Sequence, residues 1–341
     1  MKPPNKKITI YQVANRAGVA ISTVSRVLND SPNVSDKTKE KVQMAIDELN
    51  FRPQVSARKL ASRKPQMLAI AVPSFTTPYY NEVLKGVKDE IEAMDLDIVI
   101  YNTGSKNPKE GIENFFNRGT ADTVISISID IDENIHRQIQ ASGMPIVLIG
   151  TSHPDYDYID LNHRKGGFIA GEHLVKQGYK NIGLIRPALE TKAGMLREEG
   201  FIDALKEFKM PINRKLFLTG QSTKHAGFTE EAGFEAIYEY EKLGEFPDAI
   251  FCANDTQAIG AYHALNKLGV RVPQDIGLMG YDNIKFTKYL DLTTMDQKMY
   301  SIGVQATKRL AEIIAGDNDT KLQIAIDPVL VARNSTNNPN K

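Results

Sequence analysis

The sequence contains no tryptophan and only one cysteine, Cys252, among its 341 residues. One cysteine excludes a disulfide within the chain, and its apolar surroundings favour a buried core thiol. No apolar run reaches the roughly 18 residues of a membrane-spanning helix, and no apolar signal core follows the basic N-terminus. We therefore expect a cytoplasmic protein with no membrane association. A content of 41% apolar and 25% charged residues is typical of globular proteins.

The net charge is zero, but the charges are unevenly distributed along the chain. Residues 1–64 contain 13 basic and 5 acidic residues, a net charge of +8, and the other 277 residues carry −8. The length suggests two to three globular units of about 150 residues each. A small basic unit joined to a larger acidic body indicates a polyanionic partner for the N-terminal part. A solvated basic tail is the alternative.

The basic segment has the apolar spacing of three short helices. Val13 lies on the apolar face of the first helix and Val24 on that of the second, and Gly18 between them allows a left-handed turn. The third helix is expected after Ser35, a favourable N-cap, and Pro53 limits it. Two helices around a glycine turn in a basic unit are typical of helix-turn-helix DNA-binding domains.

The second of these helices carries polar residues on the face opposite its apolar residues. Arginine can bind guanine through two hydrogen bonds, and short hydroxyl side chains can bind phosphates or base edges. At the start of the helix, Ile21 could contact a thymine methyl group or pack onto the first helix, and the sequence leaves both possibilities open. The polar residues are Ser22, Thr23, Ser25, Arg26 and Asn29.

Residues 8–60 resemble the DNA-binding headpiece of the lactose-repressor family of bacterial transcription regulators. The resemblance rests on Thr-Val-Ser-Arg-Val-Leu-Asn at 23–29 and Pro-Asn-Val-Ser at 32–35, and it extends through essentially the whole chain. One departure is Ala20, where the family usually has a serine N-cap. The resemblance implies a homodimer on a palindromic operator of double-stranded DNA, and it places Thr9 and Tyr11 in the expected DNA-binding set.

The segment at 54–65 resembles the hinge of the same family. In the family the hinge folds on DNA and inserts the residue at Leu60 into the minor groove, where an apolar wedge can unstack a base step. The resemblance therefore adds Ala57, Arg58 and Leu60 to the DNA-binding residues. A flexible basic linker is the alternative. Residues 331–341 contain no leucine heptads, so we do not expect a tetramer held by a C-terminal coiled coil.

Beyond Lys64 the pattern changes to short apolar strands alternating with helices. We expect strands at 67–72, 97–101, 124–129 and 145–149, and then at 181–185, 250–253 and 277–279. Helices are expected at 81–93, from about 109, up to 176 and at 197–208. Two such runs predict an α/β body of two doubly wound parallel-sheet subdomains, like those of periplasmic binding proteins, after the all-α headpiece. Their ligand should lie beyond the carboxyl ends of the strands.

The expected domains follow from these patterns. They are a helix-turn-helix headpiece at 1–53, a hinge at 54–65, a first effector-binding subdomain at 66–164 and 296–322, a second at 165–293 and 324–333, and a tail at 334–341.

Residues that follow strands are the candidates for ligand binding in the cleft. Tyr79 and Tyr80 resemble an aromatic pair of the family's effector pocket, although Tyr80 could instead pack under the next helix. Arg197 aligns with the family's effector-binding arginine, and Asp255 could bind ligand or cap a helix. The family's usual Asp-Asn falls at 162–163, which read Asn-His, so no role is carried over there. The expected effector-binding residues are Tyr79, Tyr80, Arg197, Phe228, Asn254, Asp255, Asp282 and Gln297.

The sequence lacks the signatures of catalysis. It has no phosphate-binding loop and no dinucleotide fingerprint, no nucleophile in a Ser-His-acid context, and none of its six histidines has metal-ligand spacing. We expect no enzyme, no metal and no cofactor. The expected function is an effector-responsive, sequence-specific transcription regulator, a repressor, with a sugar or sugar derivative in the cleft. The alternatives are a purine or protein corepressor, a sugar-binding protein without a regulatory role, and an enzyme such as a sugar kinase.

Overall fold

The computed structural model describes residues 8–28, 31–51, 65–92, 94, 96–317 and 319–339. The chain divides into two compact units, Met1–Gln66 and Met67–Lys341, and each is described by itself. None of the helices in these described ranges is both long and apolar enough to cross a bilayer.

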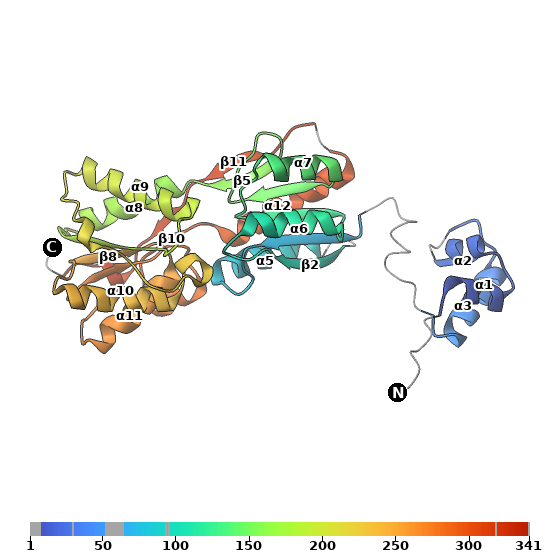
Figure 1. Ribbon diagram of the computed structural model, residues 1–341, viewed down its shortest axis with the longest axis horizontal. Helices are drawn as coiled ribbons and strands as arrows, with labels where there is room; N and C mark the ends of the chain where they lie inside the picture. Colours follow the sequence, from blue (N-terminus) through green and yellow to red (C-terminus); the bar gives the residue numbers. More distant parts are fainter. Residues whose placement is uncertain are drawn as a thin grey trace. The chain divides into compact units, whose positions relative to one another are not determined.

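The N-terminal unit, the headpiece, contains three helices: α1 (Ile10–Ala17), α2 (Ile21–Leu28) and α3 (Asp36–Glu48) (Figure 1). Gly18 ends α1 with a φ of 66°, a left-handed conformation that glycine adopts without steric cost. Val13, Val24 and Val42, one from each helix, are completely buried in a common core. The three predicted helices and the turn between the first two are therefore confirmed.

The body begins with a lobe built on a six-stranded parallel sheet in the order β11-β5-β4-β3-β1-β2. Helices cover both faces of the sheet, and its central strands are buried on both sides. The strands are β1 (Met67–Val72), β2 (Asp97–Asn102), β3 (Thr123–Ile127), β4 (Ile146–Ile149), β5 (Asp157–Leu161) and β11 (Gln323–Ile326). One face is covered by α5 (Pro78–Ile91) and α12 (Met299–Ala315), and the other by α6 (Pro108–Arg118) and α7 (Glu133–Ser142).

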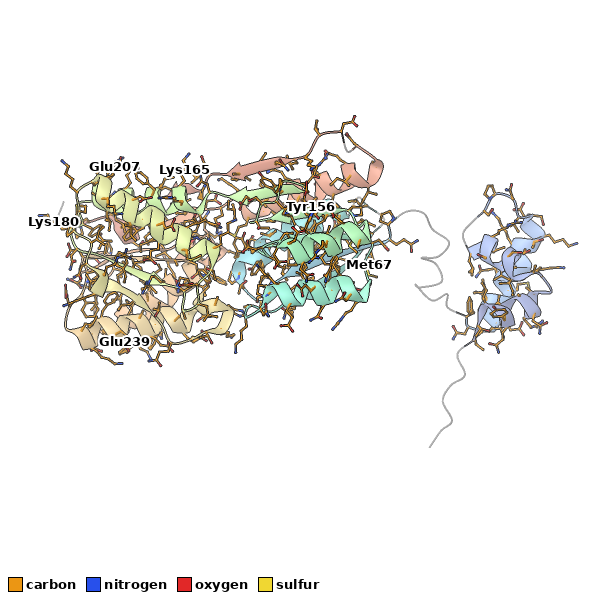
Figure 2. The ribbon with its side chains drawn as sticks, turned by 45° about the horizontal axis from the view of Figure 1, so that its top comes forward. Met67, Tyr156, Lys165, Lys180, Glu207 and Glu239 are labelled. Atoms are coloured by element: carbon orange, nitrogen blue, oxygen red, sulfur yellow. The ribbon has the colours of Figure 1, made fainter. Side chains whose placement is uncertain are left out.

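The second lobe contains a four-stranded parallel sheet in the order β7-β6-β8-β9. Its two helix layers lie on opposite faces, and Figure 2 shows Glu207 and Glu239 on their outer sides. The strands are β6 (Ile182–Arg186), β7 (Phe217–Thr219), β8 (Ala249–Cys252) and β9 (Gly277–Met279). One layer contains α8 (His163–Lys176) and α9 (Lys192–Glu207), and the other contains α10 (Glu230–Leu243) and α11 (Asp255–Lys267).

Short elements complete the second lobe. The strands β10 (Thr294–Asp296) and β12 (Val329–Val331) pair antiparallel, and Met295 and Leu330 of this pair pack into the core of the second lobe. Single 3₁₀ turns lie at Arg214–Leu216, Lys224–Gly227, Lys285–Tyr289 and Asn334–Thr336.

The chain passes between the two lobes three times: from β5 to α8, from β10 to α12, and from β11 to β12. The last passage differs from the expected boundary near residue 323. Residues 323–326 pair in parallel with β5 of the first lobe. Residues 324–326 therefore belong to the first lobe, although the sequence predicted them in the second. The alternation of strands and helices confirms the expected fold class, with all-α headpiece and α/β body.

Candidate functional site

The outer face of α2 carries the side chains expected to contact DNA. Ser22 and Arg26, one helical turn apart, are exposed, whereas Val24 between them is completely buried. Ile21 is 40% exposed, which leaves much of its apolar surface open to a partner. Thr23 and Ser25 are half-buried at the edges of this face. The helix therefore presents an arginine and a hydroxyl where a major groove could receive them.

Two further expected residues lie at the start of α1. Thr9 precedes the helix, and its backbone N–H donates to Oε1 of Gln12 at 2.9 Å, which is half of a capping box. Tyr11 is 68% exposed although it is a large aromatic residue. Arg16 forms an ion pair with Glu48 of α3 at 2.7 Å and so joins two helices of the headpiece. Four other expected DNA-binding residues lie outside the described residues: Asn29, Ala57, Arg58 and Leu60.

The body contains a cavity of about 350 Å³ lined by residues of both lobes, which is within the usual size range for small-molecule sites. Tyr79 and Tyr80, in the first turn of α5, form part of its wall and pack edge-to-face with ring centroids 5.1 Å apart. Burial raises the pKa of Tyr80 to about 12, so both the ring and a neutral hydroxyl are available to a ligand. Six expected effector-binding residues line the cavity: Tyr79, Tyr80, Arg197, Phe228, Asn254 and Asp282.

Arg197 of α9 supplies a buried cation at this cavity. Its side chain is 6% exposed, its guanidinium lies 3.8 Å from the ring centre of Tyr281, and Nη1 donates to the carbonyl of Ala253 at 2.5 Å. Nη2 lies 3.7 Å from Oδ1 of Asp282 and 3.5 Å from Nδ1 of His163. Nε is buried with no hydrogen-bond partner among the described residues. Within the described part of the chain, Arg197 therefore has one unpaired donor, which is shielded from solvent.

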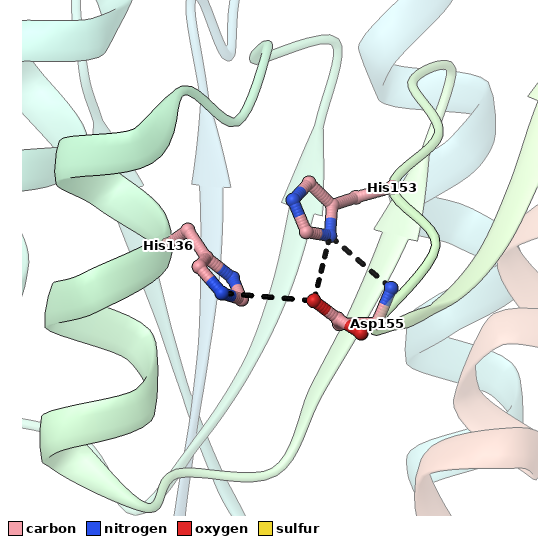
Figure 3. Close-up of side chains that lie close together, drawn as sticks. All are labelled: His136, His153 and Asp155. Carbon is pink, nitrogen blue, oxygen red and sulfur yellow. Dashed lines mark hydrogen bonds and ion pairs between the residues drawn. The ribbon is translucent and has the colours of Figure 1, made fainter.

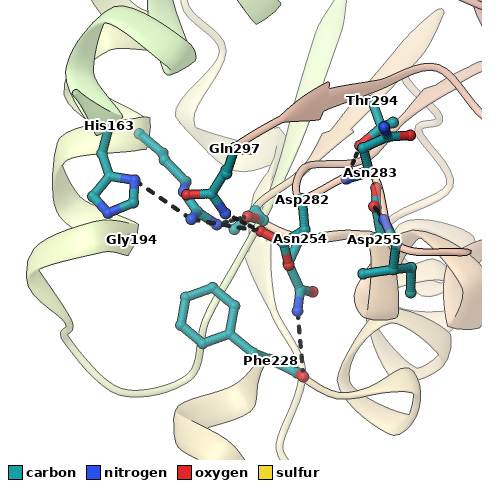
Figure 4. A network of polar contacts seen from close by, with 12 residues as sticks. His163, Gly194, Phe228, Asn254, Asp255, Asp282, Asn283, Thr294 and Gln297 are labelled. Atoms are coloured by element: carbon teal, nitrogen blue, oxygen red, sulfur yellow. Dashed lines mark hydrogen bonds and ion pairs between the residues drawn. The ribbon is translucent and has the colours of Figure 1, made fainter. Parts of the chain in front are cut away.

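Asp282 is the anion that faces this arginine. Its side chain is 5% exposed, and burial raises its pKa, while the Arg197 guanidinium and a hydrogen bond from Gln297 oppose that rise. Nε2 of Gln297 donates to Oδ1 of Asp282 at 2.5 Å, and Figure 4 shows the two side chains meeting beside His163. Gln297 is completely buried and does not line the cavity. Its hydrogen bond positions Asp282, and direct contact of Gln297 with a ligand stays a prediction.

The neighbouring residues Asn254 and Asp255 have different positions. Asn254 lines the cavity and is the N-cap of α11, because its Oδ1 accepts from the backbone N–H of Gln257 at 2.9 Å. Asp255 is completely buried outside the lining. Its carboxylate accepts from Thr294 Oγ1 at 2.6 Å and from the N–H of Ile284 at 2.9 Å. Asp255 thus fixes the loop after β9 (Figure 4), and its expected contact with ligand is not supported by this placement.

The structure also brings residues to the cavity that the sequence analysis did not select. His163 is buried beside Arg197, and burial together with the nearby cations of Arg197 and Lys192 lowers its pKa well below the usual value. Because an arginine only donates, Nδ1 of the neutral His163 ring must accept, so Nε2 carries the proton. Thr191 caps α9 and lines the cavity. His225 has a φ of 49° and its Nε2 lies 3.5 Å from Thr76 Oγ1 of the other lobe.

Comparison with known proteins assigns both parts of the chain. A family described as "Bacterial regulatory proteins, lacI family" matches residues 9–54, and a "Periplasmic binding protein-like domain" matches residues 172–336. The "HTH-type transcriptional repressor PurR" of Mannheimia succiniciproducens is 32% identical over 335 residues, which cover 96% of this chain and 98% of that relative. The protein of the same name from Actinobacillus pleuropneumoniae is also 32% identical, over 343 residues covering 98% and 99% of the two chains.

The chain belongs to the lacI family of bacterial regulatory proteins.

Solved structures of lacI-family regulators have the same fold over nearly the whole chain. The lac repressor dimer bound to operator and the anti-inducer ONPF has a TM-score of 0.76 at 27% identity and covers 97% of this chain and 99% of its own. A regulator from Silicibacter pomeroyi has a TM-score of 0.81 at 25% identity, covering 96% and 99%. The complex of the regulator CelR with cellobiose has a TM-score of 0.69 at 26% identity, covering 96% and 100%.

Membership of the lacI family confirms the resemblance found in the sequence and identifies the chain as a DNA-binding transcriptional regulator. The relatives are regulators rather than enzymes, which supports the expectation that the chain is not an enzyme. The most informative residue missed by sequence reasoning is His163. The one signal in the sequence was that His163 stands where the family usually has an asparagine. Its role becomes visible only in the structure, where the buried ring contacts Arg197.

Proposed function

We propose that this chain is a repressor that binds a palindromic operator as a homodimer, and that a small molecule in the cavity alters its affinity for that operator. The single observation that carries the proposal is that one chain has both an exposed arginine-bearing α2 face and a ligand-sized cavity between two lobes. Such a regulator works where the chromosome lies, so the proposal includes a cytoplasmic location.

Arg26 is assigned the main base contact, because a planar fork can bind O6 and N7 of guanine together. Ser22 and Ile21 beside it would contact neighbouring bases or a thymine methyl group, and Tyr11 would position the headpiece on the phosphates. Thr23, Ser25 and Thr9 are proposed as further phosphate contacts. The roles of Asn29 and of the hinge residues Ala57, Arg58 and Leu60 are proposed from the family resemblance alone.

The homodimer is proposed to form through β2 and its surroundings. β2 is the outermost strand of the six-stranded sheet, and Ile98, Val99 and Ile100 are 37%, 37% and 46% exposed. A groove beside this strand is lined by Leu84 of α5 and by Phe286, which is 59% exposed. An apolar edge of this kind invites association unless a partner covers it. A two-fold dimer would also match the two-fold symmetry of a palindromic operator.

A sugar or sugar derivative is the proposed ligand. Each sugar hydroxyl both donates and accepts, and the cavity offers the donor Arg197 beside the acceptor Asp282, with Asn254 on the same wall. The rings of Tyr79 and Phe228 supply surfaces for the apolar face of a sugar ring. A purine is the second candidate, because the relatives that are 32% identical carry the name PurR.

The mechanism follows from the three passages between the lobes. A ligand that contacts both lobes binds best at one angle between them, and its differential affinity for the two angles shifts the equilibrium. In a dimer that angle would set the spacing of the two headpieces. The contact between Thr76 and His225 joins the lobes beside the cavity, so ligand entry would alter a direct link between them.

The DNA-binding part is tested by selecting operators from random double-stranded DNA with the full-length protein. Fluorescence anisotropy then compares affinities for selected and random DNA. Arg26→Ala should reduce their ratio by about tenfold or more, since one bidentate base contact contributes roughly 1–3 kcal/mol of discrimination. Lys41→Ala is the matched control, because Lys41 is an exposed cation on α3; it should leave the ratio unchanged. Equal effects of both variants on both DNAs would contradict the assignment.

The ligand is tested by thermal shift of the full-length protein with sugars, sugar phosphates, nucleosides and purines. A ligand at a hundredfold excess over its Kd stabilises the folded state by about 2.7 kcal/mol. Phe228→Ala should abolish the shift, whereas Phe234→Ala, a half-buried ring of α10 outside the cavity, should retain it. A purine hit would overturn the sugar assignment, and no hit in the panel would favour a protein corepressor.

A further inference from the structure

A cluster of two histidines and an aspartate lies on the first lobe, outside the lining of the cavity. His136 belongs to α7, and His153 and Asp155 belong to the segment that precedes β5. The two imidazole rings stack with centroids 4.7 Å apart and an interplanar angle of 27°. Nε2 of His136 lies 3.6 Å, and Nδ1 of His153 4.0 Å, from the same oxygen of Asp155 (Figure 3). One ligand atom from each residue lies within 4.8 Å of the other two.

The hydrogen bonds around His136 fix which of its nitrogens is available. The Tyr156 hydroxyl lies 2.8 Å from Nδ1 of His136 and 3.3 Å from the carbonyl oxygen of His136. A carbonyl only accepts, so the hydroxyl donates its single proton there and accepts from Nδ1–H. When the ring carries only this proton, its Nε2 lone pair faces the Asp155 carboxylate. A divalent ion or a second proton could bridge this nitrogen and the carboxylate.

A hydrogen bond also fixes the ring of His153. The backbone N–H of Asp155 donates to Nδ1 of His153 at 3.2 Å, so Nδ1 is unprotonated, and a metal ion would have to replace this hydrogen bond to bind its lone pair. The side chains of His136 and His153 are 12% and 19% exposed, whereas that of Asp155 is 54% exposed. The histidines are therefore held in place, and solvent can reach the carboxylate side.

We propose that His136, His153 and Asp155 bind one divalent transition-metal ion, with zinc as the simplest candidate. Two imidazoles and one carboxylate are a ligand set that suits zinc and its neighbours, and water would complete the coordination. Bond lengths of about 2.0–2.1 Å separate tetrahedral ligands by roughly 3.3 Å, so the observed 3.6 and 4.0 Å, and a third separation of at most 4.8 Å, require the three side chains to close around the ion. Tyr156 would act as a positioning residue that orients His136.

The surrounding charges set a further expectation. Nζ of Lys321 lies 3.9 Å from Oδ1 of Asp155 and donates to the carbonyl of Pro154 at 3.1 Å. This ammonium offsets part of the carboxylate charge and would repel a metal ion. Lys321→Met should therefore raise the metal affinity by at least about threefold. The nearby Glu133, which acts on His153 electrostatically, would favour the cation.

The separation of the ligands along the chain explains why the histidine spacing indicated no metal site. His136 is on a helix that covers the sheet, and His153 follows β4, so only the fold brings them together. The cluster is built entirely from first-lobe residues. Its metal binding can therefore be measured independently of DNA and of any ligand in the cavity.

The test is a titration of the full-length protein with Zn²⁺ after dialysis against a chelator, using a chromogenic chelator as competitor. Co²⁺ serves as a second probe through its visible absorption. We expect one ion per chain. His136→Gln and His153→Gln should each weaken binding by at least about tenfold, and Tyr156→Phe by roughly tenfold. His263→Gln, on the exposed side of α11, is the matched control and should bind like the wild type.

Circular dichroism of each metal-free variant checks that it is folded. Absence of saturable binding to the folded wild-type protein would overturn the proposal, because a proton alone would then bridge His136 and Asp155. Equal affinities of His136→Gln and His263→Gln would also overturn it, since the ion would then bind elsewhere. A variant that loses metal binding while retaining its spectrum and its operator affinity would support the site.

Discussion

Replacement of Arg197 by alanine should lower the free energy of unfolding by an amount that depends on pH. Arg197 is buried beside Asp282, with Nη2 3.7 Å from the carboxylate. Breaking a buried ion pair by removing one partner costs about 3–5 kcal/mol, because the other charge stays buried and unpaired. In Arg197→Ala the carboxylate can escape this cost only by taking up a proton.

The sign of the pH dependence follows from the pKa of Asp282. Burial already raises this pKa, and Arg197 opposes the rise, so the variant should raise it further. A carboxyl whose pKa is higher in the folded state contributes stability that is present at low pH and is lost as pH rises through that value. We therefore expect the free energy of unfolding of Arg197→Ala to be lower than that of the wild type by about 3–5 kcal/mol at pH 8.5. At pH 5.5 the difference should be smaller by roughly 1 kcal/mol or more.

Urea unfolding of the full-length protein, followed by circular dichroism at both pH values, measures these losses. Arg197→Ala combined with Asp282→Asn removes the titrating group, so the free energy of unfolding of this double variant should lack the pH dependence that Asp282 causes. The single and double variants together give the coupling between the two residues. Arg214→Ala is the matched control, because this arginine pairs with Glu198 at the surface and should have little effect. A pH-independent loss in Arg197→Ala, or one no larger than in Arg214→Ala, would show that Arg197 and Asp282 do not form a coupled buried pair.

Three other predictions concern packing, assembly and the thiol. Gly200→Ala should destabilise the protein by more than about 3 kcal/mol, because its Cβ would lie 1.8 Å from the carbonyl oxygen of Arg164 across the α8–α9 contact; an unchanged melting temperature would contradict that contact. Ile98→Lys should convert a dimer to a monomer in sedimentation velocity; a wild-type monomer at micromolar concentration would argue against the proposed interface. Cys252 is completely buried and burial raises its pKa, so a disulfide-exchange reagent at pH 8 should modify it only in urea.

Much of the fold could be predicted because its strands are continuous apolar runs. Met67–Val72 and Gly277–Met279 were predicted with the bounds that the structure gives. The start of α5 was placed at Asn81 instead of Pro78, although Pro78 after the cap residue Thr77 is itself a helix-start signal. The partner of β11 could not be predicted, because Gln323–Ile326 pairs with a strand far away in the sequence.

The residues of the candidate site could likewise be predicted only in part. Arg197 and Asp282 were selected because they follow or face strand ends in recognisable motifs, and both line the cavity. Asp255 and Gln297 were selected together with them as polar residues near strand ends, but their side chains bind other protein groups. That difference depends on tertiary hydrogen bonds with Thr294 and Asp282, which no local pattern contains. Sequence motifs therefore selected six residues of the cavity lining, but they could not show which of the selected side chains bind other protein groups instead.

We expect the cavity and the DNA-binding surface to be coupled within one repressor. Fluorescence anisotropy of a labelled selected operator, with and without the compound that gives the largest thermal shift in the panel, measures this coupling. We predict that the saturating compound changes the operator Kd at least about tenfold, which corresponds to 1.4 kcal/mol of coupling, and that Phe228→Ala abolishes the change. The same operator Kd with and without a compound that demonstrably occupies the cavity would contradict the account.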